Sequence, residues 1–434
     1  MEKLRKELCA DGLLARIRES FLKIPDTSKR ASEYSLPDCL MSGLALFGLK
    51  NASLLEFDKN RDGGFIKHNL NALYKVKKAP CDTSLRERLD LVNPTHLSQT
   101  FGEVFAALQR GKVLEDYPFY EGYYLTPLDG TGFFSSPDIY CKSCCQKEHR
   151  DGSITYHHQM LSAVLVHPNH KEVFPFAPEA MVKQDGSKKN DCERNAAKRL
   201  LPRIRREHPH LKMIIVGDAL YGNAPFISML KELEMKYILG VKPDDHKHLF
   251  EFFKAAKKIT HELVDADGTK HHYEFSNGLP LNDTHSDVSV NMIDYTETKS
   301  NGKIQHFTWI TDFTVTTDNV SLFVKGGRAR WKIENETFNT LKNQGYHFEH
   351  NFGHGNEHLS TVFANLMMLA FFVDQVQQHC CPLFQAALKK KERKCYLWNC
   401  IRALTTHYFV DSWQDLFNSI AYGYEGHRLT PNTT

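Results

Sequence analysis

Three acidic residues stand in sequence settings that could support metal-dependent chemistry. Asp129 and Asp218 each directly follow a short apolar run typical of a β-strand, residues 123–128 and 213–217. A carboxylate at the carboxyl end of a strand lies where α/β sheets place ligands and catalytic groups. Aspartates after strands are also common turn formers, so either interpretation is open for each residue taken alone.

The third acid, Glu334, belongs to a segment predicted to be helical over residues 328–343. At about 100° per residue, Glu334 falls inside an apolar stripe on this helix. The stripe consists of Trp331, Phe338 and Leu341. A carboxylate in such a stripe needs a cation that compensates its burial. Arg330 could supply it through an ordinary helix pair, and a metal ion shared with the two aspartates is the alternative.

Three carboxylates on two strands and a facing helix fit the requirements of phosphodiester cleavage. Two Mg²⁺ ions about 4 Å apart can activate the nucleophile and stabilise the leaving oxygen. Mg²⁺ prefers hard oxygen ligands and few protein ligands. We therefore predict a Mg²⁺ site at Asp129, Asp218 and Glu334, in which Mn²⁺ can substitute.

A cysteine cluster indicates a second metal. Cys141 and Cys144 have the C-x₂-C spacing of zinc ligands, but no second pair has matching spacing. Four residues could complete the site if the fold brings them near: Cys192, His149, His157 and His158. The alternative is a reduced, partly exposed cysteine loop. His354, between two glycines, is predicted to be a turn residue, or else to line the catalytic site.

Three blocks together resemble a known family. They are Asp-Gly-Thr-Gly at 129–132, Ile-Val-Gly-Asp-Ala-Leu-Tyr-Gly at 215–222, and Arg-Ala-Arg-Trp-Lys-Ile-Glu-Asn at 328–335. The set resembles the insertion-sequence DDE transposases, and within them the branch with a Tyr-Arg-Glu-Lys signature and a β-rich insertion between the second Asp and the Glu. The resemblance covers roughly residues 80–370.

The resemblance implies a ribonuclease-H-like catalytic core, with Asp129, Asp218 and Glu334 as the catalytic, metal-holding triad. It also implies DNA contacts by Arg330, which matches the signature Arg. The signature Tyr would fall at Gly327 and is missing. The signature Lys would fall at Leu341, although Lys342 follows it.

Three further residues are candidates for DNA binding: Arg328, Lys342 and Trp309. Trp309 stands on an alternating run in the predicted insertion. In hairpin-forming relatives an insertion tryptophan stacks on a flipped base. A tryptophan that packs in a small β-core is the alternative.

The predicted organisation is α/β. Residues 1–115 are expected to be helical and to bind DNA ends, and residues 116–241 and 319–375 to form the catalytic core. Residues 242–318 would be the β-rich insertion, and residues 376–434 a helical C-terminal part. Predicted elements include helices over 40–47, 82–89, 97–108, 193–206 and 224–233, and a β-hairpin over 160–176.

Composition sets limits on the class of protein. The 434 residues are 41% hydrophobic and 25% charged, as in ordinary globular proteins, and the net charge is only +3. Basic runs at 188–212 and 389–394 could bind phosphates or be solvated helix faces. No signal sequence is evident, and no apolar run approaches the ~20 residues that span a bilayer, the longest being 366–373. Eleven cysteines without a secretion signal indicate a reducing cytoplasm.

The sequence thus predicts a cytoplasmic DNA transposase that cleaves element ends and transfers strands into target DNA. Its partner would be double-stranded DNA, bound by a homodimer, without a membrane. Two alternatives remain: a structure-specific nuclease on the same core, and a non-catalytic DNA-binding protein derived from a transposase.

Overall fold

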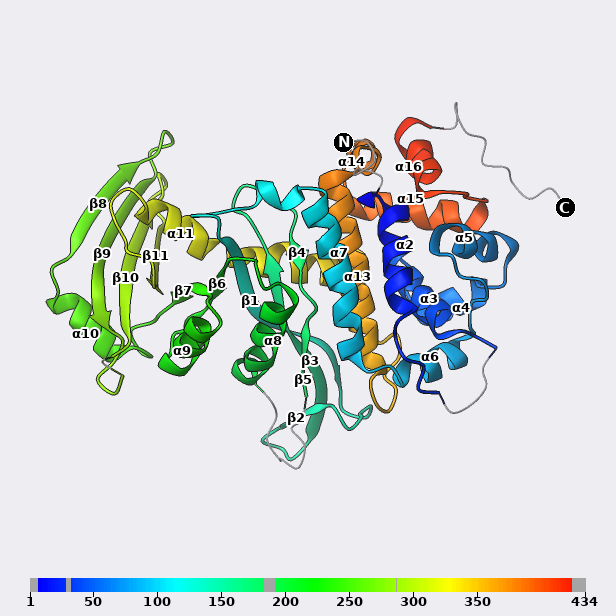
Figure 1. Cartoon of the computed structure of the whole chain (residues 1–434), viewed down its shortest axis with the longest axis horizontal. Helices are drawn as coiled ribbons and strands as arrows, with labels where there is room; N and C mark the ends of the chain where they lie inside the picture. The colour runs from blue at the N-terminus through cyan, green and yellow to red at the C-terminus, as the bar shows by residue number, and fades with distance from the viewer. Residues whose placement is uncertain (1–6, 29–32, 183–191, 286, 424–434) are drawn as a thin grey trace.

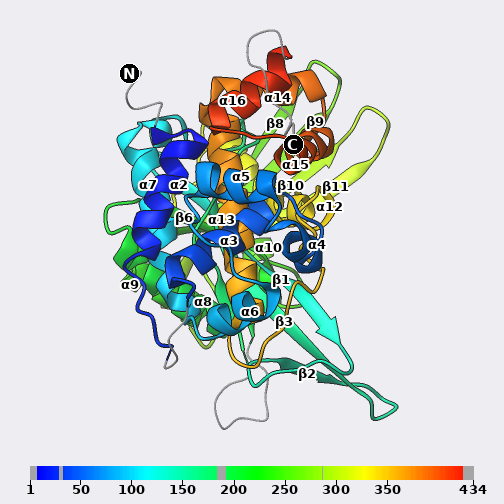
Figure 2. The ribbon, with the colours of Figure 1, turned by 90° about the vertical axis from the view of Figure 1, so that its right-hand side faces the viewer.

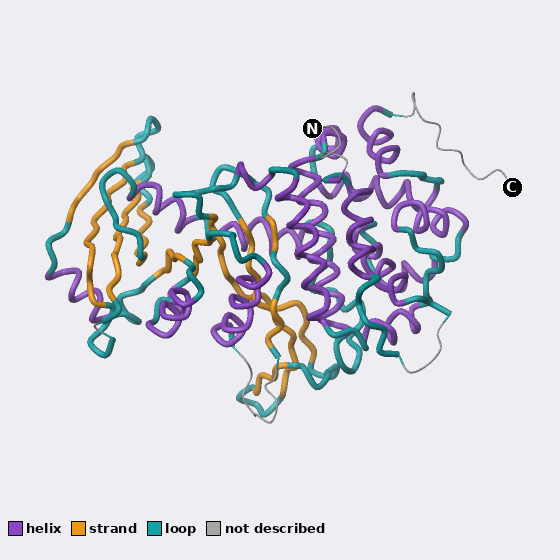
Figure 3. The backbone as a smooth tube through the Cα atoms, viewed as in Figure 1, coloured by secondary structure: helices purple, strands orange, loops and turns teal. Residues whose placement is uncertain are grey.

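The computed structural model describes residues 7–28, 33–182, 192–285 and 287–423. Within them a mixed sheet runs through one part of the molecule, and a body of packed helices forms the other part (Figure 1; Figure 3). The prediction of a mixed α/β protein is confirmed.

The sheet has eleven strands among the described residues, in the order β2-β3-β1-β6-β7-β11-β10-β9-β8, with β4 and β5 also paired to β3. In chain order they are β1 (Tyr124–Ser136), β2 (Cys145–Glu148), β3 (Ile154–Leu165), β4 (Phe174–Pro175), β5 (Glu179–Met181), β6 (Met213–Gly217), β7 (Lys236–Gly240), β8 (Ile259–Val264), β9 (Lys270–Pro280), β10 (Ser289–Thr298) and β11 (Ile304–Thr311). Strands β6 and β7 run parallel to β1, and β3 runs antiparallel to it. The predicted hairpin is confirmed by the β3–β4 pairing.

Strand β1 is central although it contains Pro127. Proline has no N–H to donate to a ladder. The pairing of β1 with β3 is interrupted at this residue, between the Leu125–Val166 bridge and the ladder that begins at Leu128. The parallel pairing with β6 continues as far as Pro127, so the proline interrupts the sheet on one side only.

The β-rich residues 242–318 form no separate sheet. Helix α10 (Lys247–Ala255) comes first, and β8 to β11 then extend the main sheet, because β11 pairs antiparallel with β7. β8 has a largely exposed pattern without alternation, and the sequence did not indicate it. Figure 1 shows these strands curving away from the helical body.

The remaining helices are α2 (Ala10–Phe21), α3 (Leu36–Gly48), α4 (Leu54–Asn60), α5 (Gly64–Tyr74), α6 (Asp82–Asp90), η1 (Pro94–Leu97), α7 (Ser98–Arg110), η2 (Val113–Asp116), α8 (Glu193–Glu207), η3 (Ala219–Tyr221), α9 (Ala224–Glu232), α11 (Val320–Arg328), η4 (Ile333–Phe338), α12 (Asn339–Asn343), α13 (Leu359–Cys380), α14 (Pro382–Lys391), α15 (Lys394–His407) and α16 (Trp413–Tyr422). Helix α3 begins before the predicted segment 40–47, and Ser35 accepts from the Asp38 N–H at 3.2 Å as its N-cap. Helix α6 includes the predicted segment 82–89, with Cys81 as its N-cap and the Asp82 carboxylate paired with Arg86.

Helix α13 joins the N-terminal and C-terminal helices into one body, since it packs on α3, α2, α7 and α14 (Figure 1). It is longer than the apolar run at 366–373 suggested, and is long and apolar enough to cross a membrane. However, 94% of an apolar 18-residue stretch of this helix is buried inside the molecule, as in the core helix of a globular protein.

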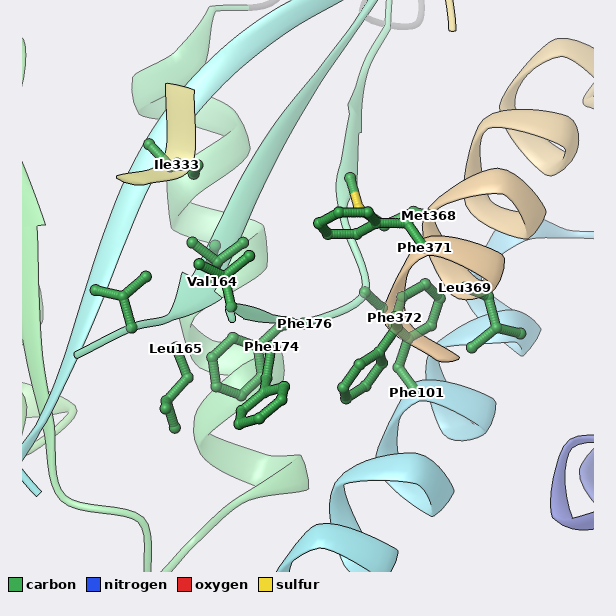
Figure 4. Close-up of a cluster of buried hydrophobic side chains, with 14 of the residues drawn as sticks. Phe101, Val164, Leu165, Phe174, Phe176, Ile333, Met368, Leu369, Phe371 and Phe372 are labelled. Atoms are coloured by element: carbon green, nitrogen blue, oxygen red, sulfur yellow. The ribbon is translucent and has the colours of Figure 1, made fainter. Parts of the chain in front are cut away.

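The core between sheet and helices is aromatic. Phe174 and Phe176 lie against Phe101 of α7 and Phe372 of α13 (Figure 4). Phe105 stacks on Phe176 with ring centroids 4.5 Å apart. Such rings bury large apolar areas and add directional contacts. This packing fixes the helical body against β3 and β4.

Candidate functional site

Asp129 and Asp218 lie on neighbouring parallel strands. The β1–β6 ladder pairs Tyr124 with Met213 and ends at Pro127 and Val216. Continued by two residues beyond the ladder, the same register would set Asp129 opposite Asp218. Asp129 does not end its strand as predicted, because β1 runs on to Ser136 on its pairing with β3. It lies where parallel pairing stops, so its side chain still reaches the open edge.

Asp218 ends β6 as predicted and begins a tight turn. Its Oδ1 accepts a hydrogen bond from the Leu220 N–H at 2.9 Å, which makes it the N-cap of η3. The turn-former interpretation is therefore confirmed for this residue. One carboxylate oxygen is occupied by the cap, and no ion pair to Asp218 occurs in the described part of the chain.

Glu334 is joined to Asp129 through Arg330. The guanidinium donates from Nη1 to Asp129 Oδ2 at 3.3 Å and lies with Nη2 2.8 Å from Glu334 Oε1. The arginine is therefore the cation nearest to both carboxylates, as the helix-pair alternative predicted. The same contacts show that the tertiary fold brings Glu334 and Asp129 to one cation.

The helix that carries Glu334 is irregular. The predicted helix over 328–343 is confirmed only in part: α11 ends at Arg328, a turn follows at 329–330, and residues 331–343 are helical with a π-helical stretch at 333–338 before α12. The assumed 100° per residue therefore fails. Trp331 is 47% exposed and therefore does not belong to the buried apolar face. Ile333, which is 0% exposed, does belong to it. π-helical turns often occur at functional sites.

Glu193, the first residue of α8, is a fourth acid at this site, and sequence reasoning missed it. A Cβ on Gly130 would lie 2.7 Å from Glu193 Cδ, so the side chain lies directly over the backbone next to Asp129. Its Oε2 accepts a hydrogen bond from Tyr221 Oη at 3.3 Å. Two features of the sequence could have indicated it: a glycine, Gly130, directly after Asp129, and an acidic first residue in an otherwise basic helix.

The electrostatics of these acids indicate uncompensated negative charge. Burial raises the pKa of Asp129 to about 7, with Glu334 and Glu193 adding to the rise and Arg330 opposing it. Burial and the nearby Asp218 raise the pKa of Glu193 as well. A single arginine does not balance four carboxylates, so a further cation would be stabilised here.

Arg328 and Lys342, two other candidate DNA contacts, pair with acids outside the predicted triad. Arg328 forms an ion pair with Glu297 of β10, and its guanidinium lies 5.4 Å from the Phe307 ring centroid. Lys342 pairs with Glu349 at 2.8 Å, and not with any of the carboxylates. Arg328 lines a groove of about 330 Å³ together with Lys325 and Lys332.

Trp309 is buried, with 6% of its surface exposed. It stacks on Phe307 with centroids 5.5 Å apart, and a Cβ on Gly327 would lie 2.6 Å from its Nε1. The indole therefore fills the space beside Gly327. In this conformation Trp309 is a packing residue, as the alternative stated.

The C-x₂-C pair lies in a four-residue cluster. Cys141 and Cys144 meet His158 of β3 and His354 of the loop before α13, with all four ligand atoms within 4.8 Å of one another. Of the predicted partners only His158 takes part. His149 bonds Thr155 instead, and neither His157 nor Cys192 belongs to the cluster. His354 is 7% exposed and is not a simple turn residue.

Within the described ranges one other group of this kind occurs, His170, Glu172 and His379. Glu172 already accepts from Gln378 at 2.7 Å. Burial opposes ionisation of Glu172, but the hydrogen bonds from His379 and Gln378 outweigh it and lower the pKa to about 2. The three predicted catalytic carboxylates do not form such a tight group, so one ion could not bind all three without some closure.

The basic runs are mostly structural where the structure describes them. Arg199 and Arg203 of α8 both pair with Glu179 of β5. Arg205 donates to backbone carbonyls, including that of Leu233 at 2.8 Å. Lys188 and Lys189 lie outside the described residues. The run at 389–394 spans the end of α14 and the start of α15.

A comparison with family models shows the family to which the chain belongs. Residues 142–372 match the family model described as "Transposase DDE domain". This match includes Asp218 and Glu334, while Asp129 precedes it. Among solved structures, the chain is similar to a piggyBac transposase in a synaptic complex with hairpin DNA, at 10% identity and a TM-score of 0.41, covering 99% of this chain and 82% of that one. A search of curated proteins found no match.

Proposed function

Because the chain belongs to the transposase DDE domain family, we propose that it is a transposase that cleaves DNA at element ends and joins the freed ends to target DNA. The observation that carries this proposal is the contact of Arg330 with both Asp129 and Glu334, beside a strand register that sets Asp218 next to Asp129. Such placement on rigid elements is what a preorganised site needs.

The acids suit a divalent metal. Their oxygen atoms are the hard ligands that Mg²⁺ and Mn²⁺ prefer, and burial raises the pKa of Asp129, with the negative charges of Glu334 and Glu193 adding to the rise. In this proposal Asp129, Asp218 and Glu334 hold the metal. When bound, the metal would supply activation of the attacking oxygen and stabilisation of the leaving oxygen.

Arg330 would have two roles, one toward the carboxylates and one toward DNA. Without metal it balances Asp129 and Glu334, and it keeps the two carboxylates at one position. With DNA present, the same guanidinium could donate to a phosphate oxygen near the scissile bond, where its planar fork binds well. The arginine would then be a phosphate contact as well as a positioning residue.

Glu193 would assist the same carboxylates. Its position over Gly130 and its hydrogen bond from Tyr221 hold a negative charge beside Asp129 and Asp218. An added carboxylate makes cation binding more favourable and raises the pKa values of its neighbours. We infer a positioning role for it at the metal site.

The DNA path would follow the groove beside α11. Lys325, Arg328 and Lys332 bring positive charge there, and Tyr273 and Tyr295 provide ring faces. Lysine and arginine bind the phosphate backbone, and aromatic rings stack on unpaired bases. Lys342 would contact phosphate after release from Glu349. The helical N-terminal part would bind element ends, and two chains would pair two ends.

Two features support a ribonuclease-H-like core and the Tyr-Arg-Glu-Lys branch. Strand β1 has an antiparallel neighbour on one side and parallel β6 and β7 on the other, the order expected of such a core. The place of the missing signature Tyr at Gly327 is filled by the Trp309 indole. In this proposal the tryptophan substitutes for the packing of that tyrosine, and base stacking by Trp309 would require its release.

The test uses the full chain and a supercoiled plasmid that carries the gene with its native flanks. Wild type should cut at the flanks in Mg²⁺ or Mn²⁺ and not in EDTA, and Asp218→Asn should not cut. Asn keeps the Oδ1 acceptor for Leu220, so the turn should survive. Asp244→Asn, an exposed acid after β7, is the matched control.

The outcomes separate the alternatives. Cutting by wild type together with joining of pre-cleaved ends supports a transposase. Cutting without joining favours a structure-specific nuclease. DNA binding with no metal-dependent cutting by wild type would leave only a DNA-binding protein.

A further inference from the structure

We propose that Cys141, Cys144, His158 and His354 bind one structural zinc ion, which fastens the projecting end of the β1–β3 region to the loop before α13. The site lies outside the carboxylate site, and it does not depend on the proposed reaction. Its four donors are two sulfur and two imidazole nitrogen atoms, the ligand set of many structural zinc sites.

The distances between donors fit a tetrahedron. Zinc–sulfur bonds of about 2.3 Å and zinc–nitrogen bonds of about 2.0–2.1 Å imply ligand separations of roughly 3.3–3.8 Å at tetrahedral angles. The two Sγ atoms are 3.8 Å apart, and the two Nε2 atoms are 3.2 Å apart. The Sγ–Nε2 separations of His158 are 3.4 Å to Cys141 and 3.3 Å to Cys144. Cys144 Sγ lies 3.3 Å from His354 Nε2.

The imidazoles are oriented to present lone pairs inward. His354 Nδ1 lies 3.1 Å from the Gly355 carbonyl oxygen and donates to it. This bond leaves Nε2 unprotonated and directed at the cluster. Zinc-binding histidines almost always have such a second hydrogen bond. The Nε2 atoms of His158 and His354 lie 3.2 Å apart, a separation at which both can bind the same cation.

Most of the site is shielded from solvent. Cys144, His158 and His354 are 1%, 2% and 7% exposed, whereas Cys141 is partly exposed. Phe133 stacks on the His158 ring with centroids 5.7 Å apart, and Phe134 packs on His354 at 4.5 Å. With four protein ligands and no open position, the ion would be structural and not catalytic.

The ion would connect segments far apart in the sequence. Cys141 and Cys144 lie between β1 and β2, His158 lies on β3, and His354 lies in the loop between α12 and α13. The β2–β3 end projects from the body in Figure 2. The loop is also held by Asp90 of α6, which accepts from four backbone N–H groups at residues 356–359. Zinc would therefore fix the projecting strands to the same loop that α6 holds.

The first measurement is the metal content of the purified full chain after passage over a chelating resin. Wild type should retain close to one zinc per chain. Loss of a group that hydrogen-bonds to a metal ligand typically lowers metal affinity by roughly 10–100-fold, and loss of a ligand should lower it at least as much. His354→Ala and Cys144→Ser should therefore lose most of their zinc. His157→Ala and Cys395→Ser are matched controls, since His157 is the neighbour of His158 on β3 and Cys395 is exposed.

The second measurement removes doubt about folding of the variants. Wild-type protein stripped of zinc should bind Co²⁺ and show the thiolate charge-transfer and visible bands of a tetrahedral S₂N₂ site. A chelator should also lower its Tm. Zinc-free wild type that gives no such Co²⁺ spectrum would overturn the proposal, as would a Cys141–Cys144 disulfide found in protein purified under reducing conditions. Neither result would bear on DNA cleavage, because the readouts are metal content and absorption.

Discussion

The carboxylate site and the Cys/His cluster both lie beside strand β1, but they differ in donor atoms, charge and exposure. Asp129 belongs to β1, and His158 pairs with Phe134 five residues further along β1. The acids have one arginine among four carboxylates and are only partly enclosed. The cluster has two thiols and two imidazoles, and three of its four residues are buried while Cys141 is partly exposed. Under the two proposals, the first site would exchange a hard cation and the second would hold zinc permanently.

The largest effect should come from Asp218→Asn. This change removes a carboxylate from the metal site while keeping the cap of η3, so plasmid cleavage should fall below detection and zinc content should stay at the wild-type level. Cleavage by gel assay and zinc by elemental analysis check the two halves. Zinc loss in this variant would show that the two sites are not independent.

The converse change is His354→Ala. Loss of a bound metal is among the few mechanisms that destabilise a protein by more than about 3 kcal/mol per substitution. We expect a large fall in Tm, and we expect that EDTA, which lowers the Tm of wild type, has little further effect on the variant. Differential scanning calorimetry measures both. An unchanged Tm would contradict a structural role.

Arg330→Gln should sharpen the contrast at the carboxylate site. Without the guanidinium, Asp129 and Glu334 lose their nearest cation. Added Mg²⁺ should then raise the Tm of the variant more than that of wild type, although cleavage falls. Arg86→Gln is a matched control, because Arg86 forms a similar i,i+4 pair with Asp82 in α6. Equal Mg²⁺ responses of variant and wild type would count against a metal beside Arg330.

The pH dependence follows from the pKa of Asp129, which is raised from 3.8 to about 7. A raised folded-state pKa means that the stabilising contribution is full below the unfolded value and is lost as pH rises through 7. Without divalent metal, the free energy of unfolding should therefore fall between about pH 4 and 7 in wild type, and fall less in Asp129→Asn. Mg²⁺ binding should strengthen over the same window. Urea unfolding at a series of pH values, with and without Mg²⁺, measures both the free energy of unfolding and its change on Mg²⁺ binding.

The smallest effect should come from Glu193→Gln. The amide still fits over Gly130 and still accepts from Tyr221, but it removes one charge. The pKa of Asp129 should fall, and Mg²⁺ affinity should weaken by roughly 10-fold, as for other groups around a metal. Mg²⁺ titration of the cleavage rate checks this. A variant as inactive as Asp218→Asn would make Glu193 a direct ligand.

The sequence by itself determined most elements and the candidate acids. Apolar runs predicted α3, α7, α8 and β6, because burial imposes a pattern of apolar residues that the chain displays. Asp129, Asp218 and Glu334 were identifiable from the elements before them and from the family blocks. The Cys141–Cys144 spacing also indicated zinc without any structure.

Only the tertiary structure decided which residues meet. Glu193 is 64 residues from Asp129 in the sequence, and His354 is 210 residues from Cys144. The local spacing of residues cannot predict contacts over such separations. The π-helical turn at Glu334 and the exposure of Trp331 also depend on packing, which overrides the regular helix that local spacing predicts. Local patterns fix how each segment can bury itself, whereas long-range packing fixes which side chains share one cation.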